Sequence, residues 1–345
     1  EVTQVVRKNA TIDWTRKESV QAKLRIEVKK VLKRTGYPPD GQQKATDDVL
    51  EQAKRLGIRL SSPEPANDDV PSIPPSSRAR PFPYPIARFD ALLTTQPEAI
   101  LRVKTYRDAF EKALAFMAGC ALSLVTAQNG GKMPDKALAL LKKVLGKPIS
   151  MGAWHELAWR LSAMVTPGSA ALVRAVRALA TLEGKPSPLM NEVMTEVVEE
   201  RNVFSHSVTP TSELVAEAEP GLTALWERFK KAISPLTETR LVVSVRFEDM
   251  DHPNRYHFSV RVLEGSSDMF PVRRMTLPQK LKDTFCYLLD GEDVFDLGPL
   301  VFAHHDAQMA RHEVFVARKI SGLEKGDKVE GAAVSGPSGA KVVVG

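Results

Sequence analysis

The sequence predicts an α+β protein made of an N-terminal helical hairpin, an all-α bundle and a small C-terminal β-rich module. The hydrophobic period is that of a helix up to about residue 235 and changes from 3.6 to 2 beyond it. A proline-rich stretch separates the first helices from the rest. A length of 345 residues is enough for two or three domains. We therefore expect domains at 1–60, 89–235 and 236–345, with a linker at 61–88.

The first block has the pattern of two amphipathic helices. Over 14–34 the apolar residues Val20, Leu24 and Val28 recur at helical spacing. A second helix is expected over 45–56, closed by Gly57. Two helices of this size cannot bury their apolar faces alone, so the hairpin should dock on upstream chain or on a partner. Its basic surface is a candidate nucleic-acid or partner interface, formed by Arg16, Lys17, Lys23, Arg25, Lys29, Lys30 and Lys33.

The net charge of +6 belongs entirely to this block. Residues 1–60 carry 14 Lys and Arg against 8 Asp and Glu, whereas the remaining 285 residues carry 34 of each. The composition therefore gives no support for nucleic-acid binding by the whole chain. A local basic patch would have Arg174, Arg177, Arg228, Lys230 and Lys231 as its candidate RNA contacts. The chain begins with Glu1, which suggests an internal cut in a longer polypeptide or a processed end.

Residues 61–88 hold eight of the 24 prolines and predict a semi-stiff linker, with a proline-rich ligand as the functional alternative. Beyond it we expect a long apolar helix that ends at Gln128, before Asn129-Gly130-Gly131. We interpret this helix as buried rather than membrane-spanning, because its apolar part is short for a bilayer. Further helices are expected at about 134–145, 150–165, 168–183, 188–204 and 212–233, the last interrupted at Pro220-Gly221.

After residue 235 the alternation predicts a hairpin of strands over 241–247 and 256–262. Short strands should follow at 285–289, 300–302 and 313–317. Histidines in the loop between two of these strands could bind a metal ion. No metal-ligand motif is repeated there and no group of acidic ligands surrounds them, so we expect no metal site and no cofactor. The four residues concerned are His304, His305, Asp306 and His312.

Several classes of protein are disfavoured by missing motifs. The chain has no P-loop, no C-x-x-C pair, no H-E-x-x-H and no G-x-S-x-G. Its two cysteines cannot form a disulfide framework, which favours a reducing, cytoplasmic location. The short apolar part of the long helix favours no membrane association. His155, between Trp154 and Trp159, is expected to be packed rather than catalytic.

The 188–204 helix is expected to bury one apolar face, formed by Met190, Val193, Met194 and Val197. One spacing stands out at the end of this helix: Arg201-Asn202 followed by His206. A neutral histidine can take the proton of a ribose 2′-hydroxyl, and a guanidinium can stabilise the charge that builds on the phosphoryl oxygens. The amide can orient either group. This set is therefore a candidate catalytic site, Arg201, Asn202 and His206, for metal-independent cleavage of RNA.

Geometry leaves alternatives open. Five residues of regular helix would place Arg201 and His206 about 140° apart. The site needs the helix to end near Phe204-Ser205, or Arg201 to reach round it, or two protomers to share the site. In the structural alternative, Arg201 pairs with a carboxylate and His206 caps the helix. The nearby carboxylates are Glu196, Glu199 and Glu200.

The R-N-x-x-x-H arrangement within a helical domain, residues 97–235, resembles the HEPN superfamily. That resemblance implies a metal-independent endoribonuclease site formed where two protomers meet, with RNA or tRNA as substrate and a homodimer through this domain. Many members of the superfamily are instead inactive dimerisation or partner-binding modules, which is the alternative function.

Residues 9–56 are similar to the C-terminal helical region of type I restriction enzyme R subunits. The similarity rests on Asn9 to Trp14, the basic helix, Gly36-Tyr-Pro-Pro-Asp40 and Ala45 to Ala53. It implies a subunit tail that docks on the methyltransferase core of a restriction complex through these helices. The nuclease and motor of that family are not in this sequence. The combined expectation is a phage-defence subunit tail bearing a candidate ribonuclease.

Overall fold

The computed structural model describes residues 80–145, 148–199, 212–267, 270–282, 285–306, 311–321, 328–333 and 341–344, together with residues 26, 29, 30 and 46. The chain divides into two compact units, 1–77 and 78–345. The four described residues of the first unit are all helical; Thr46 is buried, whereas Ile26 is 57% exposed.

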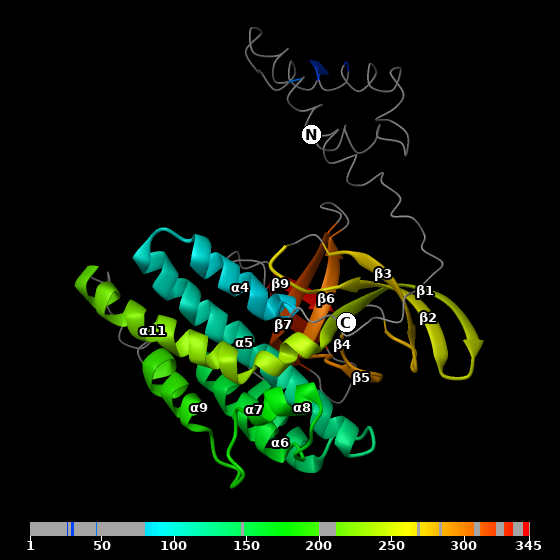
Figure 1. The fold of residues 1–345 in the computed structure, drawn as a ribbon, viewed down its shortest axis with the longest axis horizontal. Coiled ribbons are helices and arrows are strands. Elements are labelled where there is room, and N and C mark those ends of the chain that lie inside the picture. Colours follow the sequence, from blue (N-terminus) through cyan, green and yellow to red (C-terminus); the bar gives the residue numbers. More distant parts are fainter. Residues whose placement is uncertain are drawn as a thin grey trace. The chain divides into compact units, whose positions relative to one another are not determined.

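The second unit begins with a helical layer built around one long helix, α5 (Ala99–Gln128), which lies between α4 (Tyr84–Thr95) and α11 (Ser212–Ala232) (Figure 1). The C-terminal end of α5 is the one predicted from the sequence: the helix stops at Gln128, before Gly130 and Gly131, both of which have positive φ. The remaining helical elements are α6 (Asp135–Leu145), α7 (Met151–Met164), α8 (Ala171–Arg177), α9 (Pro188–Val193), the π-helical turn η1 (Met194–Glu199) and the 3-10 helix η2 (Ser234–Glu238).

Helix α5 is also the one described helix that is long and apolar enough to cross a membrane. Most of its apolar window, 78%, is buried inside the fold. Phe110, Phe116 and Leu114 on this helix are completely inaccessible to solvent. The helix thus has the packing of a central core helix, as the sequence predicted.

The strands form two antiparallel sheets, with orders β3-β2-β1-β4-β5 and β6-β7-β8-β9. The predicted 241–247 and 256–262 hairpin is present as β1 and β2, and the three shorter predicted strands correspond to β4, β6 and β7. The sequence analysis did not predict β3, β5, β8 or β9; β3 is an edge strand whose Arg273-Arg274 breaks the alternation. The strands are β1 (Arg240–His252), β2 (Arg255–Val262), β3 (Val272–Leu277), β4 (Cys286–Asp290), β5 (Asp293–Asp296), β6 (Val301–Asp306), β7 (Arg311–Ser321), β8 (Lys328–Ala333) and β9 (Lys341–Val344).

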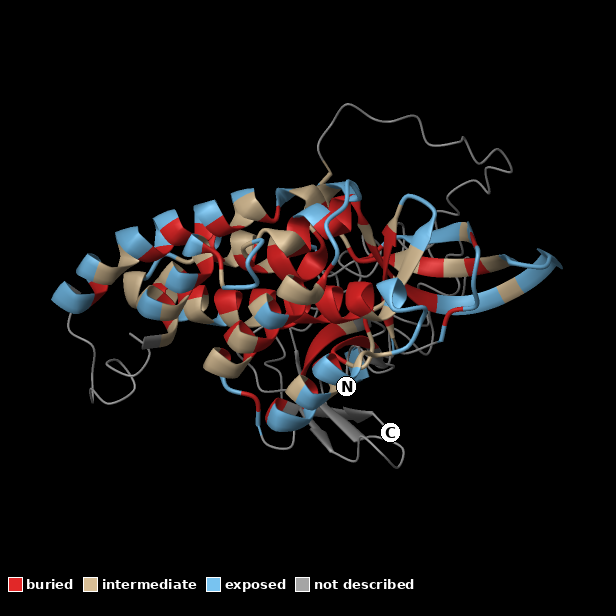
Figure 2. Ribbon diagram, turned by 90° about the horizontal axis from the view of Figure 1, so that it is seen from below, coloured by how far each residue is buried: buried red, intermediate tan, exposed pale blue. Residues whose placement is uncertain are grey.

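One hydrophobic core joins the helices to both sheets. It runs from Phe110 in α5 through Leu288 in β4 to Phe315 in β7. A Cβ added to Gly119 of α5 would lie 3.0 Å from Val301 of β6, so helix and sheet are in close contact. Buried residues fill the helical layer, whereas the far end of the β1–β2 hairpin is exposed (Figure 2). The protein is therefore α+β, and the helical and β parts, expected as separate domains, share their core.

Three predicted boundaries differ in the structure. Residues 84–88, expected in the linker, begin α4, because proline is well tolerated in the first turn of a helix and Pro85 occupies that position. The helix expected over 168–183 ends at Arg177, where the chain reverses so that Thr181 N–H donates to Lys185 O. The interruption expected at Pro220-Gly221 is wrong: α11 continues through both residues. Pro220 is exposed, so the carbonyl that loses its partner can be hydrated.

Candidate functional site

The three predicted catalytic residues, Arg201, Asn202 and His206, lie outside the described residues. The structure does describe the elements on either side of them. The π-helical turn η1 ends at Glu199, and α11 begins at Ser212. The contacts that fix η1 and α11 in the fold therefore define the surroundings of the candidate site.

The helix that leads to the motif is anchored by its apolar face. Met190, Val193 and Val197 are buried against the core, as the spacing predicted, whereas Met194, expected on the same face, is half-buried. The backbone changes from α to π at Met194, and single π turns inside α-helices are frequent at functional sites.

His155 supports this helix from α7. It is buried, and its Nε2 lies 2.7 Å from the carbonyl oxygen of Met190, where the ring N–H can donate. Burial lowers the pKa of His155, and the hydrogen bond to Met190 only partly opposes that shift. His155 is thus a neutral packed residue that fixes α9, in agreement with the sequence-based interpretation.

Helix α11 is pinned on three sides. Arg102 of α5 donates to Glu219 through Nε (2.5 Å) and Nη2 (3.2 Å), and this contact raises the pKa of the guanidinium. Arg228 forms an ion pair with Glu192 of α9. Lys230 Nζ lies 2.6 Å from the Asp90 carboxylate of α4. The two ends of the segment 200–211 therefore start from elements that are fixed to each other and to the core.

Most residues of the basic patch that the sequence suggests as an RNA contact form hydrogen bonds or ion pairs within the protein. Arg174 donates to both carboxylate oxygens of Glu238, and Arg177 donates to the carbonyl oxygens of Ser162 and Thr181. Arg228 and Lys230 are the α11 residues already paired. Of the five candidates, Lys231 alone has no partner within the described part of the chain.

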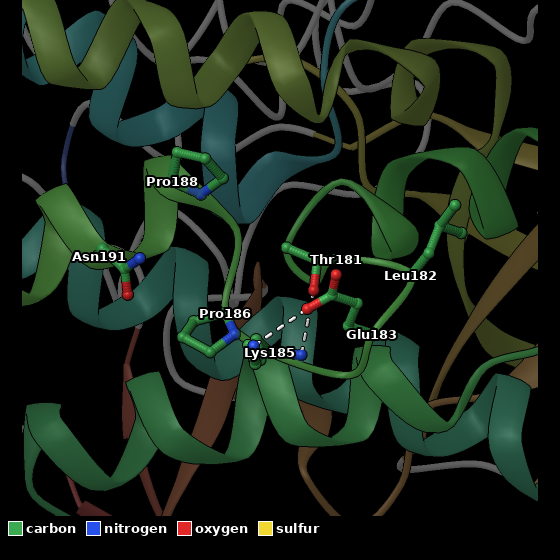
Figure 3. A pocket seen from close by; sticks show the side chains of 7 residues that line it. All are labelled: Thr181, Leu182, Glu183, Lys185, Pro186, Pro188 and Asn191. Carbon is green, nitrogen blue, oxygen red and sulfur yellow. Dashed lines mark hydrogen bonds and ion pairs between the residues drawn. The ribbon is translucent and has the colours of Figure 1, made fainter.

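A shallow hollow borders α9, the helix that leads to the motif (Figure 3). It is formed by the reversal after α8, whose tip carries Leu182 at 88% exposure. Lys185 holds the tip together: its backbone N–H donates to Thr181 Oγ1 and its Nζ lies 3.0 Å from Glu183. The lining residues are Thr181, Leu182, Glu183, Lys185, Pro186, Pro188 and Asn191.

The same reversal borders a second hollow, between α6 and α7. Its apolar floor contains the half-buried Trp159, and the Arg160 guanidinium carbon lies 4.7 Å from the centre of that ring. Sequence reasoning treated Trp159 as packing for His155 and missed this surface. The lining residues are Lys136, Ala139, Leu140, Lys143, Glu156, Trp159, Arg160, Ala163, Met164 and Gly184.

Other chemistry finds little support among the residues that the structure covers. They contain no group of three His, Cys, Asp or Glu side chains placed to hold a metal. In the β6–β7 register His305 pairs with His312, His304 with Glu313 and Asp306 with Arg311. Cys120 and Cys286 are buried, and burial raises the pKa of both thiols, which disfavours a reactive thiolate.

Of the seven basic candidates in the first unit, the structure describes two. Lys29 and Lys30 are helical and exposed. Arg16, Lys17, Lys23, Arg25 and Lys33 lie outside the described residues.

Comparison with known proteins assigns the N-terminal unit. Residues 1–57 match the family described as type I restriction enzyme HindI endonuclease subunit-like, C-terminal. A segment of 61 residues is 43% identical to the type I restriction enzyme HindI endonuclease subunit of Haemophilus influenzae. The predicted resemblance to a type I restriction R subunit is confirmed for this segment.

The match is confined to a small part of both proteins. It covers 18% of this chain and 6% of the Haemophilus influenzae subunit. No solved structure matches the chain. The comparisons therefore characterise the first unit, and the second unit is interpreted from its own residues.

Proposed function

We propose that this chain joins a docking tail of a type I restriction subunit to a HEPN-like, metal-independent endoribonuclease domain. The observation that carries the first half is the match of residues 1–57 to the C-terminal family. The second half rests on Arg201, Asn202 and His206, which follow directly on the anchored η1 turn. The tail docks on the methyltransferase core of a cytoplasmic restriction complex, and the catalytic domain adds RNA or tRNA cleavage to phage defence.

The proposed chemistry needs no group from outside the chain except water. His206 takes the proton from a ribose 2′-hydroxyl, whose oxygen attacks the adjacent phosphorus. The new 2′-O–P bond forms as the P–O5′ bond breaks, and the departing 5′ oxygen takes its proton from water. Arg201 stabilises the charge on the phosphoryl oxygens, and Asn202 orients the imidazole or the phosphate. Two protomers of a homodimer each supply one set.

A second function is favoured by one observation. Four of the five residues of the basic patch on the helical surface are paired within the fold, and the charge of residues 61–345 is balanced. Such a surface suits a HEPN-like module that dimerises or binds a protein partner without catalysis. In that case the β-rich part would contribute to recognition of the partner.

An assay of RNA cleavage by the dimer in the presence of a chelator distinguishes the ribonuclease proposal from the non-catalytic one. The ribonuclease proposal expects cleavage by the wild-type chain and at least a hundredfold loss in His206→Ala. The non-catalytic proposal expects no cleavage by either chain, together with unaltered phage resistance and partner binding in Arg201→Ala/His206→Ala.

A further inference from the structure

The hollow between α6 and α7 combines an aromatic surface with positive charge. Trp159 and Leu140 form its apolar part and are only partly buried. Lys136 and Lys143 lie seven residues apart on α6, so they stand on one face of that helix two turns apart. Both lysines are exposed. The hollow is therefore a stripe of apolar surface with cations along its length.

The charge balance of the lining is positive. Lys136, Lys143 and Arg160 are cationic, and Glu156 is the one acid among the residues that line the hollow. Glu156 Oε1 receives both Arg160 Nε (2.9 Å) and Lys143 Nζ (3.3 Å). One carboxylate thus holds two cations in place without neutralising the site, and Lys136 has no such partner among the described contacts.

The Trp159–Arg160 pair supplies a surface for flat ligands. With the guanidinium carbon 4.7 Å from the ring centre, the two groups form a cation–π contact. Aromatic rings and guanidinium planes are the groups on which proteins stack unpaired bases, and flanking lysines contact the phosphates. A duplex keeps its bases stacked inside, so this combination suits a single strand.

The hollow also lies close to the path that leads to α9, the helix that precedes the motif in the chain. Gly184 lines it, and the neighbouring Glu183 and Lys185 line the hollow of Figure 3, which reaches Asn191 on α9. A single strand that lay on α6 and α7 could pass over the 181–185 reversal to the helix that leads to Arg201.

We propose that the α6–α7 hollow binds single-stranded RNA and leads it toward α9, the helix that precedes the candidate catalytic residues in the chain. This inference rests on the proposed function for the choice of RNA. It assigns the binding contacts to Trp159, Arg160, Lys136 and Lys143, none of which belongs to the catalytic set. Binding and cleavage can therefore be tested separately.

The test is fluorescence anisotropy of a labelled, unstructured 12-nucleotide RNA with the full chain carrying Arg201→Ala/His206→Ala, which prevents cleavage. Lys136→Gln/Lys143→Gln should weaken binding about tenfold and reduce the salt dependence of log Kd by about 1.4, because each phosphate contact on a single strand contributes about 0.7. Glu156→Gln should tighten binding, since it removes the one carboxylate among the described residues that line the hollow. Trp159→Leu should weaken binding about tenfold, whereas Trp159→Phe, which keeps an aromatic face, should bind nearly as well as the parent.

The matched control is Lys104→Gln/Lys280→Gln, which removes two exposed lysines, one from α5 and one from the chain after β3, and should leave binding unchanged. Equal affinities for the control and for Lys136→Gln/Lys143→Gln would overturn the proposal, as would tighter binding of the matching single-stranded DNA or of duplex RNA. Normal cleavage by Lys136→Gln/Lys143→Gln with unchanged RNA affinity would refute the hollow but not the ribonuclease. Weakened RNA binding by Lys136→Gln/Lys143→Gln, with no RNA cleavage by the wild-type chain, would support the hollow and refute the ribonuclease.

Discussion

Arg228 on α11 forms an ion pair with Glu192 on α9, and so joins the helix that follows the candidate catalytic segment to the helix that precedes it. Both side chains are partly exposed, so the pair should contribute only about 0.2–1 kcal/mol to folding. Its larger role would be to fix the distance between the two ends of residues 200–211. Neither residue was singled out for this role by the sequence pattern, because the contact crosses 36 positions.

Reversal of one charge in this pair should therefore affect activity more than stability. Arg228→Glu places two carboxylates together and should lower RNA cleavage about tenfold, with a loss of about 1 kcal/mol in the free energy of unfolding. Glu192→Arg/Arg228→Glu restores the opposite charges and should recover most of the cleavage rate. Single-turnover cleavage with urea unfolding of the same preparations checks this. Failure of the double exchange to recover activity would show that the pair does not position the segment.

The two glycines Gly298 and Gly152 should respond oppositely to alanine. A Cβ at Gly298 would lie 2.5 Å from the Phe285 ring, so Gly298→Ala should cost about 1–3 kcal/mol through overpacking. At Gly152, in the first turn of α7, the new atom would meet Val198 at an ordinary 3.5 Å. Gly152→Ala should be neutral or stabilise the protein by up to about 1 kcal/mol. Urea denaturation measures both, and a neutral Gly298→Ala would contradict the packing described for β4 and the chain before β6.

His155 should make the stability depend on pH below neutrality. Burial holds its pKa below the ordinary 6.5, so the unfolded chain takes up a proton at a higher pH than the folded chain does. Stability should therefore fall as the pH drops below about 6.5 and stop falling below the folded pKa. His155→Gln, which can still donate to Met190 O, should show a smaller loss between pH 7.5 and 5.5. Identical pH profiles of the two chains in urea titrations would refute this.

The shared core predicts cooperative unfolding of residues 78–345. Phe315 of β7 is fully buried and its ring stacks on Phe302 at 5.5 Å. Phe315→Ala should cost about 3–5 kcal/mol. Because the core continues into α5, the fluorescence of Trp154 and Trp226 in the helices should report the same shifted midpoint as circular dichroism of the strands. Two separate transitions would favour the independent domains that the sequence predicted.

Local signals in the sequence predicted much of the fold. The end of α5 at paired glycines, the buried face of α9 and the β1–β2 hairpin each follow from the spacing of neighbouring residues. Contacts distant in sequence were beyond that reasoning. The sequence did not show that Gly119 lets β6 lie close to α5 across the predicted domain boundary at 235, a contact between residues far apart in the chain. Pro220 was predicted to interrupt its helix because the sequence does not show that this residue is exposed.

The residues of the candidate site and of the α6–α7 hollow also differ in how far the sequence could predict them. A short motif pointed to Arg201, Asn202 and His206, since residue types at fixed spacing are visible in a sequence. The Trp159 surface was missed because its cations come from two helices, Lys136 and Lys143 on one and Arg160 on the other. A half-exposed tryptophan followed by arginine is the signal that could have indicated it.

The chemical ends of RNA cut by the full chain in the presence of a chelator test the proposed ribonuclease mechanism. Attack by the 2′-hydroxyl should leave a 2′,3′-cyclic phosphate and a 5′-hydroxyl, and cleavage should be lost in His206→Ala and in RNA whose 2′-hydroxyl at the cut site is replaced by hydrogen. Products with a 5′-phosphate, or equal cleavage by wild type and His206→Ala, would contradict it.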